Sequence, residues 1–253
     1  MGIRFRLLRA LALAAALALL ASPANVAGPV EASGTTTCSG GPVAPGVYRT
    51  LSIDGACVVV GGSLTVLSGL TVAPGATLIA TTSHATVTIS GGVRVGRGAV
   101  FMFGCAPSLT ELCGPDTSYV ISGDVVAAGA LAVIMHGNTI HGSVTIAGGG
   151  GGVTCAPLIL GGEAPAYSTF EGNAIDGTLA VSGMRTCWFG IARNEVARSV
   201  ILSGNVEADP DSNEVIDNSI EGALVCFGNS PLPHNDGQPN SVTGPEVGQC
   251  AGL

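Results

Sequence analysis

The sequence predicts an all-β fold, a right-handed parallel β-helix of about nine coils with about 22 residues in each. Four phrases share one pattern: Asn, an aliphatic residue at +2, usually Gly at +4, and aliphatic residues at +6 and +8. They begin at Asn138, Asn173, Asn194 and Asn218, and an incomplete fifth begins at Asn240. Their spacings of 35, 21, 24 and 22 residues indicate one repeat length with one insertion. Such a period is typical of a solenoid, and the alternating aliphatic residues indicate β-strands.

The handedness follows from the strong preference of parallel strands for right-handed crossovers. The alternative is an aligned β-sandwich, which would show hairpin turns every 8–12 residues or so rather than this longer repeat. Stacked coils would place the aliphatic positions of each phrase in the interior. The side chains expected to be buried on this register include Ile175, Leu179, Val181, Val196, Val200 and Leu202.

The first residues are typical of a secretory signal peptide. Arg4, Arg6 and Arg9 precede an apolar stretch at 10–21, and small residues follow it. This stretch is shorter than the roughly 20 residues that span a bilayer, although an uncleaved anchor is the alternative. The expected organisation is a signal peptide at 1–27, an extension at 28–45 and a β-helix domain at 46–250. Insertions are expected near 103–117 and 147–170, the second with a flexible glycine run at 148–152.

Eight cysteines follow the predicted signal, and an even number in an exported chain favours disulfides over metal binding. No Cys-x-x-Cys spacing suggests zinc. Contacts in a solenoid reach only adjacent coils, so pairs of sequence neighbours are expected. These are Cys38 with Cys57, Cys105 with Cys113, Cys155 with Cys187, and Cys226 with Cys250.

The recurring asparagines have a structural explanation. Asparagine tolerates left-handed backbone geometry at a turn, and its amide can bond the amides above and below. We therefore expect a structural column of Asn138, Asn173, Asn194, Asn218 and Asn240. A polar surface that binds a ligand through these five amides is the alternative.

Charge excludes some partners. The chain has no lysine and a net charge of −8, which becomes −11 once three arginines leave with the signal. Nucleic acids and anionic membranes require a basic surface, so neither is an expected partner. After signal cleavage we expect a monomer without a membrane anchor.

The repeats and the closing segment, 218–250, resemble those of uncharacterised parallel β-helix proteins that bacteria export. The glycine- and valine-rich phrases are also similar to bactofilins, which are polymer-forming β-helices. This resemblance implies a fold and a compartment but no activity. Bactofilins lack a cleaved signal and a disulfide set, so their polymerisation is not transferred to this chain.

The sequence gives little evidence for catalytic residues. The Gly-His-Gly and Arg-x-Lys patterns of polygalacturonase-like β-helices are absent. Asp176 with Glu195, or Asp217 with Glu195, could approach the spacing of about 5–10 Å that two-carboxylate hydrolysis needs. A lyase would also need a base, for which Arg185, Arg193 and Arg198 are candidates. Charge balance on a solvated face is the simpler interpretation.

Other polar residues have simple interpretations beside functional ones. Asp209 and Asp211 have the start of a calcium-loop spacing but lack its later ligands, so a solvated turn is favoured over weak calcium binding. His136 and His141 are expected on opposite faces of a turn region. Trp188 either fills space under the second insertion or stacks on a neutral sugar.

The sequence therefore predicts a secreted, non-catalytic structural or ligand-binding β-helix of the extracellular space or cell envelope. No cofactor, metal or catalytic residue is expected beyond the calcium alternative, and an extracellular or cell-wall glycan is the expected partner. A carbohydrate-active enzyme, either a polysaccharide lyase or a hydrolase, is the alternative. A cleft lined by acids and an arginine would favour that enzyme.

Overall fold

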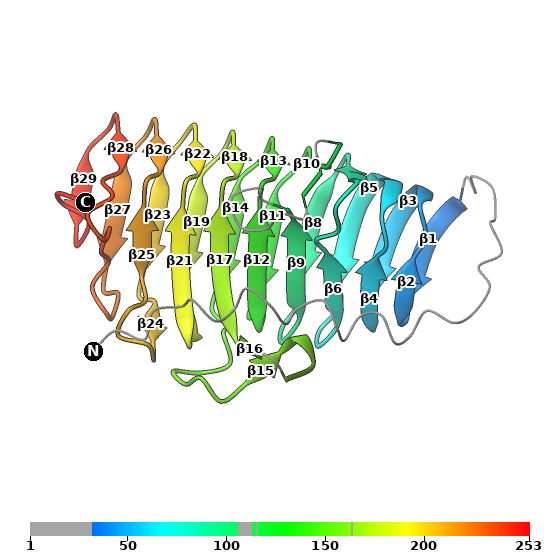
Figure 1. Cartoon of the computed structure of the whole chain (residues 1–253), viewed down its shortest axis with the longest axis horizontal. Coiled ribbons are helices and arrows are strands. Elements are labelled where there is room, and N and C mark those ends of the chain that lie inside the picture. The colour runs from blue at the N-terminus through cyan, green and yellow to red at the C-terminus, as the bar shows by residue number, and fades with distance from the viewer. Residues whose placement is uncertain (1–31, 106–112, 115, 163) are drawn as a thin grey trace.

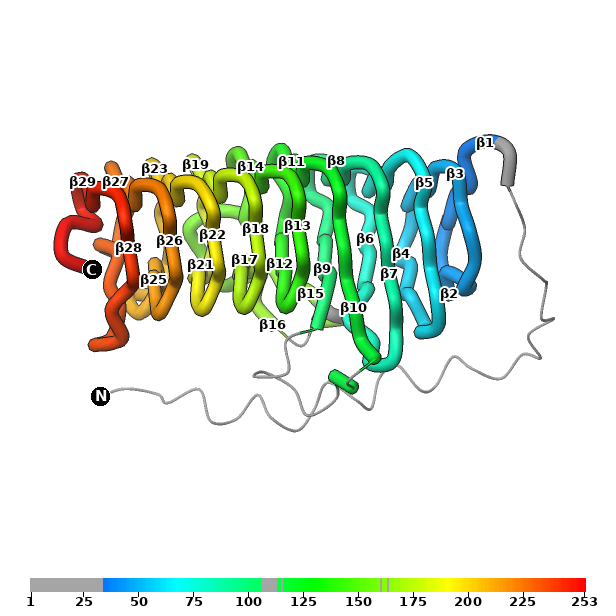
Figure 2. Tube along the Cα trace, turned by 90° about the horizontal axis from the view of Figure 1, so that it is seen from above, coloured from blue at the N-terminus to red at the C-terminus, as the bar shows by residue number. Residues whose placement is uncertain are grey.

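The protein is a rod of stacked β-coils, shown in side view in Figure 1 and along the Cα trace in Figure 2. The computed structural model describes residues 32–105, 113–114, 116–162 and 164–253, so the predicted signal peptide lies outside the described residues. Successive coils pair through parallel strands, which confirms the predicted parallel β-helix. Within the described ranges, no helix is long and apolar enough to cross a membrane.

A 17-stranded sheet, here sheet A, covers two sides of the rod. Each of the first three coils contributes one strand, and each later coil contributes two, separated by a corner. The single strands are β1 (Ala32–Cys38), β3 (Gly46–Ile53) and β5 (Gly62–Val72). The paired strands are β7 (Ala85–Ile89) and β8 (Gly92–Val95), β10 (Ser118–Ile121) and β11 (Val125–Ala128), β13 (Thr139–Ile140) and β14 (Val144–Ala147), β18 (Ala174–Ile175) and β19 (Leu179–Ser182), β22 (Glu195–Val196) and β23 (Val200–Ser203), β26 (Ser219–Ile220) and β27 (Leu224–Phe227), and β28 (Ser241–Val242) and β29 (Glu246–Gly248).

An eight-stranded sheet, here sheet B, forms the third side. Its strands are β2 (Gly41–Val43), β4 (Ala56–Val59), β6 (Thr77–Ala80), β9 (Val100–Gly104), β12 (Ala132–His136), β17 (Tyr167–Glu171), β21 (Trp188–Ala192) and β25 (Glu214–Ile216). These eight strands mark eight coils, and β26–β27 and β28–β29 add two more. Because β1 and β2 pair in parallel with β3 and β4, the coils begin before Gly46, within the segment expected to be an extension.

The corner of sheet A is visible in the burial pattern of β5. Leu64 and Val66 point into the core, and Leu70 and Val72 do so after the bend. Leu67 and Ser68 between them are both exposed, which breaks the alternation of a straight strand. Later coils place a glycine at the same point, as at Gly142, where an added Cβ would lie 2.5 Å from the Gly123 carbonyl carbon. Neighbouring coils therefore approach too closely at the corner for most side chains.

The interior is a continuous stack of aliphatic side chains. β18, β22 and β26 align Ile175, Val196 and Ile220, and all three are at most 2% exposed. The six side chains that the sequence predicts to be buried all lie in this core. The predicted register is thus confirmed.

The asparagine column is a ladder of buried amides. Asn173 donates from Nδ2 to Asn194 Oδ1 (2.9 Å) and to the Met135 carbonyl (2.9 Å). The same Asn194 Oδ1 accepts the Asn173 main-chain N–H (3.1 Å). This arrangement repeats between Asn138, Asn173, Asn194, Asn218 and Asn240. The structural explanation of the column is confirmed, because the amides are used within the protein rather than displayed to a ligand.

One detail of this column differs from the expectation. The left-handed residue is the one before each of the first four asparagines, with positive φ at Gly137, Gly172, Arg193 and Asp217. The asparagine itself is not left-handed, because its side chain must point along the rod to reach the next coil. The sequence pattern therefore reports a hydrogen-bond ladder and not an asparagine-specific turn.

A second amide ladder, which was not predicted from the sequence, lies just after strands β23, β27 and β29 of sheet A. Asn205 Nδ2 donates to Asn229 Oδ1 (3.0 Å), and Asn229 Nδ2 donates to Gln249 Oε1 (3.1 Å). Each residue follows a glycine of positive φ, namely Gly204, Gly228 and Gly248. In the sequence, this ladder could have been recognised from a glycine followed directly by Asn or Gln, which recurs at intervals of about one repeat.

The second insertion is packed against the rod. All five glycines at 148–152 have positive φ, and Gly150 N donates to the Ala130 carbonyl (2.8 Å). An added Cβ at Gly149 or Gly150 would collide with neighbouring backbone, so the expectation of a flexible glycine run is wrong. Beyond it, an antiparallel hairpin of β15 (Leu158–Ile159) and β16 (Ala164–Pro165), with a 3-10 turn η2 (Leu160–Gly162) between them, lies on the outer face of sheet B. There Ile159 and Ala164 form a small second core with Ala132 and Ile134.

Four disulfides join the pairs that the sequence predicts. Cys38–Cys57 and Cys226–Cys250 each link adjacent coils, close to the two ends of the rod. Cys155–Cys187 links the second insertion to the next coil, just before β21. A short parallel pair, β20 (Arg185–Thr186) with β24 (Val206–Glu207), completes the strands. Disulfides of this number indicate an oxidising compartment.

Replacing Leu179 with Asp should prevent folding, because this fully buried position has no partner for a charge. Ala180→Asp is the matched control, since residue 180 points outward on the same strand. Circular dichroism should show a cooperative melt for Ala180→Asp and none for Leu179→Asp. A cooperatively melting Leu179→Asp protein would contradict the register.

Asn194→Ala should lower the free energy of unfolding by about 2–4 kcal/mol, because it leaves the main-chain N–H and an Nδ2 hydrogen of Asn173 buried without their acceptor and removes the bonds that Asn194 Nδ2 donates to the Phe170 carbonyl and to Asn218 Oδ1. Asn240→Ala, at the less buried end of the ladder, should lower it less. Urea unfolding of both variants measures this difference. Equal losses would argue against a ladder whose strength depends on burial.

Candidate binding surface at the corner of sheet A

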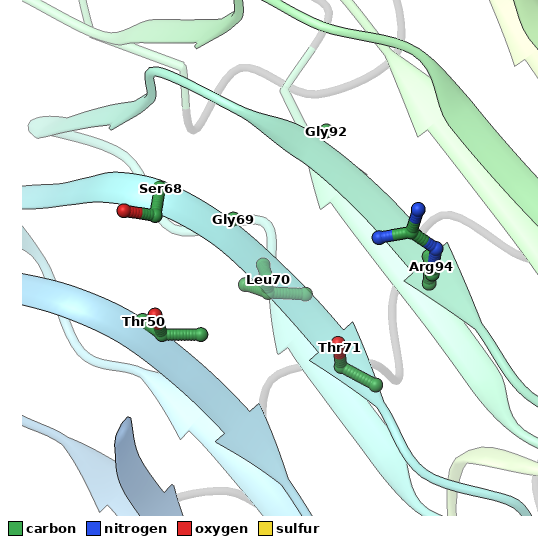
Figure 3. Close-up of a pocket in the computed structure, with 7 residues that line it drawn as sticks. All are labelled: Thr50, Ser68, Gly69, Leu70, Thr71, Gly92 and Arg94. Carbon is green, nitrogen blue, oxygen red and sulfur yellow. The ribbon is translucent and has the colours of Figure 1, made fainter. Parts of the chain in front are cut away.

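Two shallow hollows lie beside the corner of sheet A, and one of them contains an arginine. It measures about 180 Å³ and is lined by Thr50, Ser68, Gly69, Thr71, Gly92 and Arg94, above the buried Leu70. Figure 3 shows the polar side chains around the two glycine positions, which project no side chain of their own. Pairing of β3, β5 and β8 produces this set, with Thr50 opposite Gly69, Gly69 opposite Gly92, and Thr71 opposite Arg94.

The sequence interpretation did not identify this hollow as a site. The signal was present in the recurring Ser-Gly phrase, which begins at Ser68 in one coil and at Ser90 in the next. Alignment of these phrases places Thr71 beside Arg94. Polar side chains at equivalent positions of adjacent coils lie about 4.8 Å apart along the rod, close enough to contact one ligand together.

The second hollow is acidic. It measures about 190 Å³, and its lining includes Asp176, Glu195, Ser219 and Glu221. The structure therefore brings together Asp176 and Glu195, one of the two carboxylate pairs considered from the sequence. Asp217 is not part of this lining, and neither is Arg185, Arg193 or Arg198.

The three arginines are dispersed. Arg193 pairs with the buried carboxylate of Glu171, on the strand of the preceding coil. Arg185 lies in β20 and Arg198 occupies a corner position, and none of the three arginines lines the acidic hollow. The acids-with-arginine arrangement that would favour a lyase is not formed by these residues.

The two histidines lie on different sheets. His141 Nδ1 contacts Asp176 Oδ2 (2.8 Å) at an exposed position beside the acidic hollow. His136 lies at the end of β12, where burial lowers its pKa to about 4. The two side chains do not form a joint site.

Trp188 lies across the outer face of sheet B and is half-buried. Its Nε1 donates to the Asp211 carbonyl (3.0 Å), and its ring meets Tyr167 edge-on at 6.4 Å. Gly190 leaves room for the indole, because an added Cβ there would collide with the ring. Packing, rather than a free sugar-stacking platform, accounts for these contacts.

The acidic loop at 207–214 is only partly solvated. Asp209 Oδ1 accepts the Asp211 N–H (3.0 Å), which forms a tight exposed turn. In contrast, Glu207 and Asn213 are buried and bonded to each other through Asn213 Nδ2 and Glu207 Oε2 (2.5 Å). Glu207 Oε1 and Asn213 Oδ1 have no hydrogen-bond partner. The solvated turn expected at Asp209 and Asp211 therefore lies beside two buried polar residues, Glu207 and Asn213, that the sequence did not single out.

Burial controls protonation in this loop. Desolvation raises the pKa of Glu207 to about 8, although the bond from Asn213 acts in the opposite direction. Desolvation, followed by repulsion from Asp236, raises the pKa of Glu214 to about 7, and His234 opposes the change. His234 faces two acceptors, Asp236 Oδ1 (2.8 Å) and the Ser212 carbonyl (3.1 Å), and can donate to both only when protonated. Among the described residues, no group of three His, Cys, Asp or Glu side chains is placed to hold a metal ion.

Charge is distributed unevenly along the rod. Residues 46–135 contain three arginines and four acidic residues, whereas residues 136–253 contain three arginines and twelve acidic residues. The Arg94 hollow lies in the nearly neutral half, and the acidic hollow lies in the strongly negative half. An anionic ligand would therefore be repelled less at Arg94 than at any hollow further along the chain.

Stability should fall as pH rises from about 4.5 to about 8, because the folded protein keeps the Glu207 proton over a range in which the unfolded chain has lost it. Glu207→Gln should remove this component and raise stability at pH 8. Glu221→Gln, an exposed control, should leave the pH dependence unchanged. Urea unfolding from pH 4.5 to 8.5 measures the slopes, and an unchanged slope in Glu207→Gln would contradict a buried neutral carboxyl.

No protein-family model, curated protein or solved structure matches this chain. Resemblance to exported β-helices and bactofilins therefore stays a hypothesis from the sequence.

Proposed function

We propose that this protein is a non-catalytic β-helix exported to the extracellular space or cell envelope, where it acts as a rigid structural or ligand-binding rod. The observation that carries this proposal is the separation of charged groups between the two corner hollows. Asp176, Glu195 and Glu221 line one without an arginine, and Arg94 lines the other without a carboxylate. A β-eliminating site of the kind that the sequence suggested would need acids and an arginine base in one place.

The rest of the rod supports a structural role. The buried amides of both ladders are used in bonds between coils, and disulfides link coils close to both ends. Bonds of this kind favour a stiff spacer over an enzyme with a closing lid. The four disulfides suit an oxidising environment, and the basic and apolar N-terminal sequence supports export.

A carbohydrate-active enzyme is the second candidate, and the acidic hollow is the observation that favours it. Asp176 and Glu195 both line it, and the Asp176 carboxylate contacts His141. The hollow is small beside the 300–1,000 Å³ or so of typical ligand pockets, so it would contact only part of a glycan.

Purified protein incubated with pectate, alginate and neutral glucans, with and without calcium, should yield no new reducing ends and no unsaturated products. A commercial lyase and a glucanase run in parallel verify the assay. Turnover that Asp176→Asn or Glu195→Gln abolishes, while Glu246→Gln outside the hollow does not, would overturn the non-catalytic proposal in favour of the acidic hollow.

A further inference from the structure

We propose that the hollow around Arg94 binds an oxyanion carried on a hydroxylated molecule, such as the carboxylate or sulfate group of an acidic sugar. This inference goes beyond the proposed function, because a structural rod does not require a ligand at this position. It rests on four polar side chains, Thr50, Ser68, Thr71 and Arg94, that surround two glycines.

The guanidinium of Arg94 is free to meet a ligand. Three ion pairs occur among the described residues, and none of them involves Arg94, whose side chain is exposed. The nearest acid in the next coil, Asp124, accepts the Ser143 N–H (2.8 Å) with its Oδ1 and so is engaged away from the hollow. An arginine without a carboxylate partner can bond both oxygens of a carboxylate, or two of a sulfate, in parallel.

The hydroxyl groups are also uncommitted. In the described part of the chain, the hydroxyls of Thr50 and Thr71 make no side-chain hydrogen bond, and neither does that of Ser68, although Ser52 on the same strand as Thr50 bonds Asp54. Hydroxyls can donate to an oxyanion or accept from a sugar hydroxyl. The three groups thus provide the contacts that a hydroxylated ring needs beside the charge.

The glycines make the hollow a permanent feature. An added Cβ at Gly92 would lie 2.8 Å from the Asp124 carbonyl oxygen, and one at Gly69 would lie 3.0 Å from the Gly92 carbonyl oxygen. Close approach of the coils therefore keeps these positions without side chains, and the ligand would meet a rigid backbone floor. At about 180 Å³ the hollow holds one functional group and part of a ring, so a single sugar should bind weakly, in the millimolar range.

The test is an NMR titration of the purified, disulfide-bonded, 15N-labelled protein at low ionic strength. The probes are glucuronate, glucose 6-sulfate and uncharged glucose. Saturating shifts are expected at the amides of Gly69, Thr71 and Gly92 and at Arg94 Nε with at least one of the two anions. Glucose should cause no comparable shift. The tighter of the two anions identifies the ligand as carboxylated or sulfated.

Matched variants separate this site from general charge. Arg94→Gln should weaken binding at least tenfold, whereas Arg97→Gln, which removes an exposed arginine of the same coil outside the hollow, should change it less than twofold. Arg94→Lys should give an intermediate loss, because it keeps the charge without the paired donors. Equal affinity of Arg94→Gln and the parent protein, equal binding of glucose, or no saturating shift with either anion would each overturn the proposal. None of these outcomes bears on turnover, so they leave the non-catalytic proposal unaffected.

Discussion

The hydrogen bond on which this rod most depends is the one between side-chain amides of successive coils. In the first ladder, the amide oxygens of Asn173, Asn194, Asn218 and Asn240 each accept both the main-chain and the side-chain N–H of the asparagine in the preceding coil. A shift of one residue would turn the amide outward and leave its donors buried without partners, so the ladder opposes slippage that aliphatic packing alone would tolerate. A left-handed residue precedes the first four asparagines, and it is glycine in two coils and Arg193 or Asp217 in the other two. This backbone geometry points the amide along the rod.

The ladders need an end, and the structure provides one for each. Asn240 donates from its main-chain N–H and from Nδ2 to the Leu253 carbonyl (3.0 and 3.1 Å), which stands where the next asparagine oxygen would be. The second ladder ends at Gln249, whose Oε1 accepts from Asn229 and whose Nε2 donates back to the Asn229 carbonyl (2.9 Å). A longer side chain can satisfy both groups of one residue, and asparagine cannot. This explains why glutamine occupies the terminal position, and it completes the pairing of buried polar groups at this end.

Sequence periodicity predicted the coils well because each aliphatic column repeats the same contact. The neighbour-to-neighbour disulfides could also be predicted, since a solenoid excludes distant pairs. What could not be predicted depends on relations between coils that no single phrase contains. The glycine run at 148–152 is a flexible linker by composition, and it is packed because Ala130 and Arg185 supply backbone partners from other coils. Glu207 is part of an acidic stretch in the sequence, and only folding shows that it is buried beside Asn213. The Arg94 hollow likewise requires three strands that are adjacent in space.

These relations limit where function can reside. Among the described residues, the interior is filled by aliphatic and aromatic side chains, and its asparagine amides bond one another, which directs the search for function to the outer surface. Along β9 and β12 the outer face of sheet B lies under the insertion, and near the acidic loop Trp188 lies across it. The corner of sheet A differs, because glycines there remove side chains while flanking strands keep theirs. The hollow at Gly69 and Gly92 is thus a consequence of bending a stacked sheet, whereas the acidic hollow lies on the strands beside the corner and has no glycine in its lining. Hydroxyls and Arg94 surround the first hollow and carboxylates line the second, so the same rigid rod presents two surfaces of opposite charge.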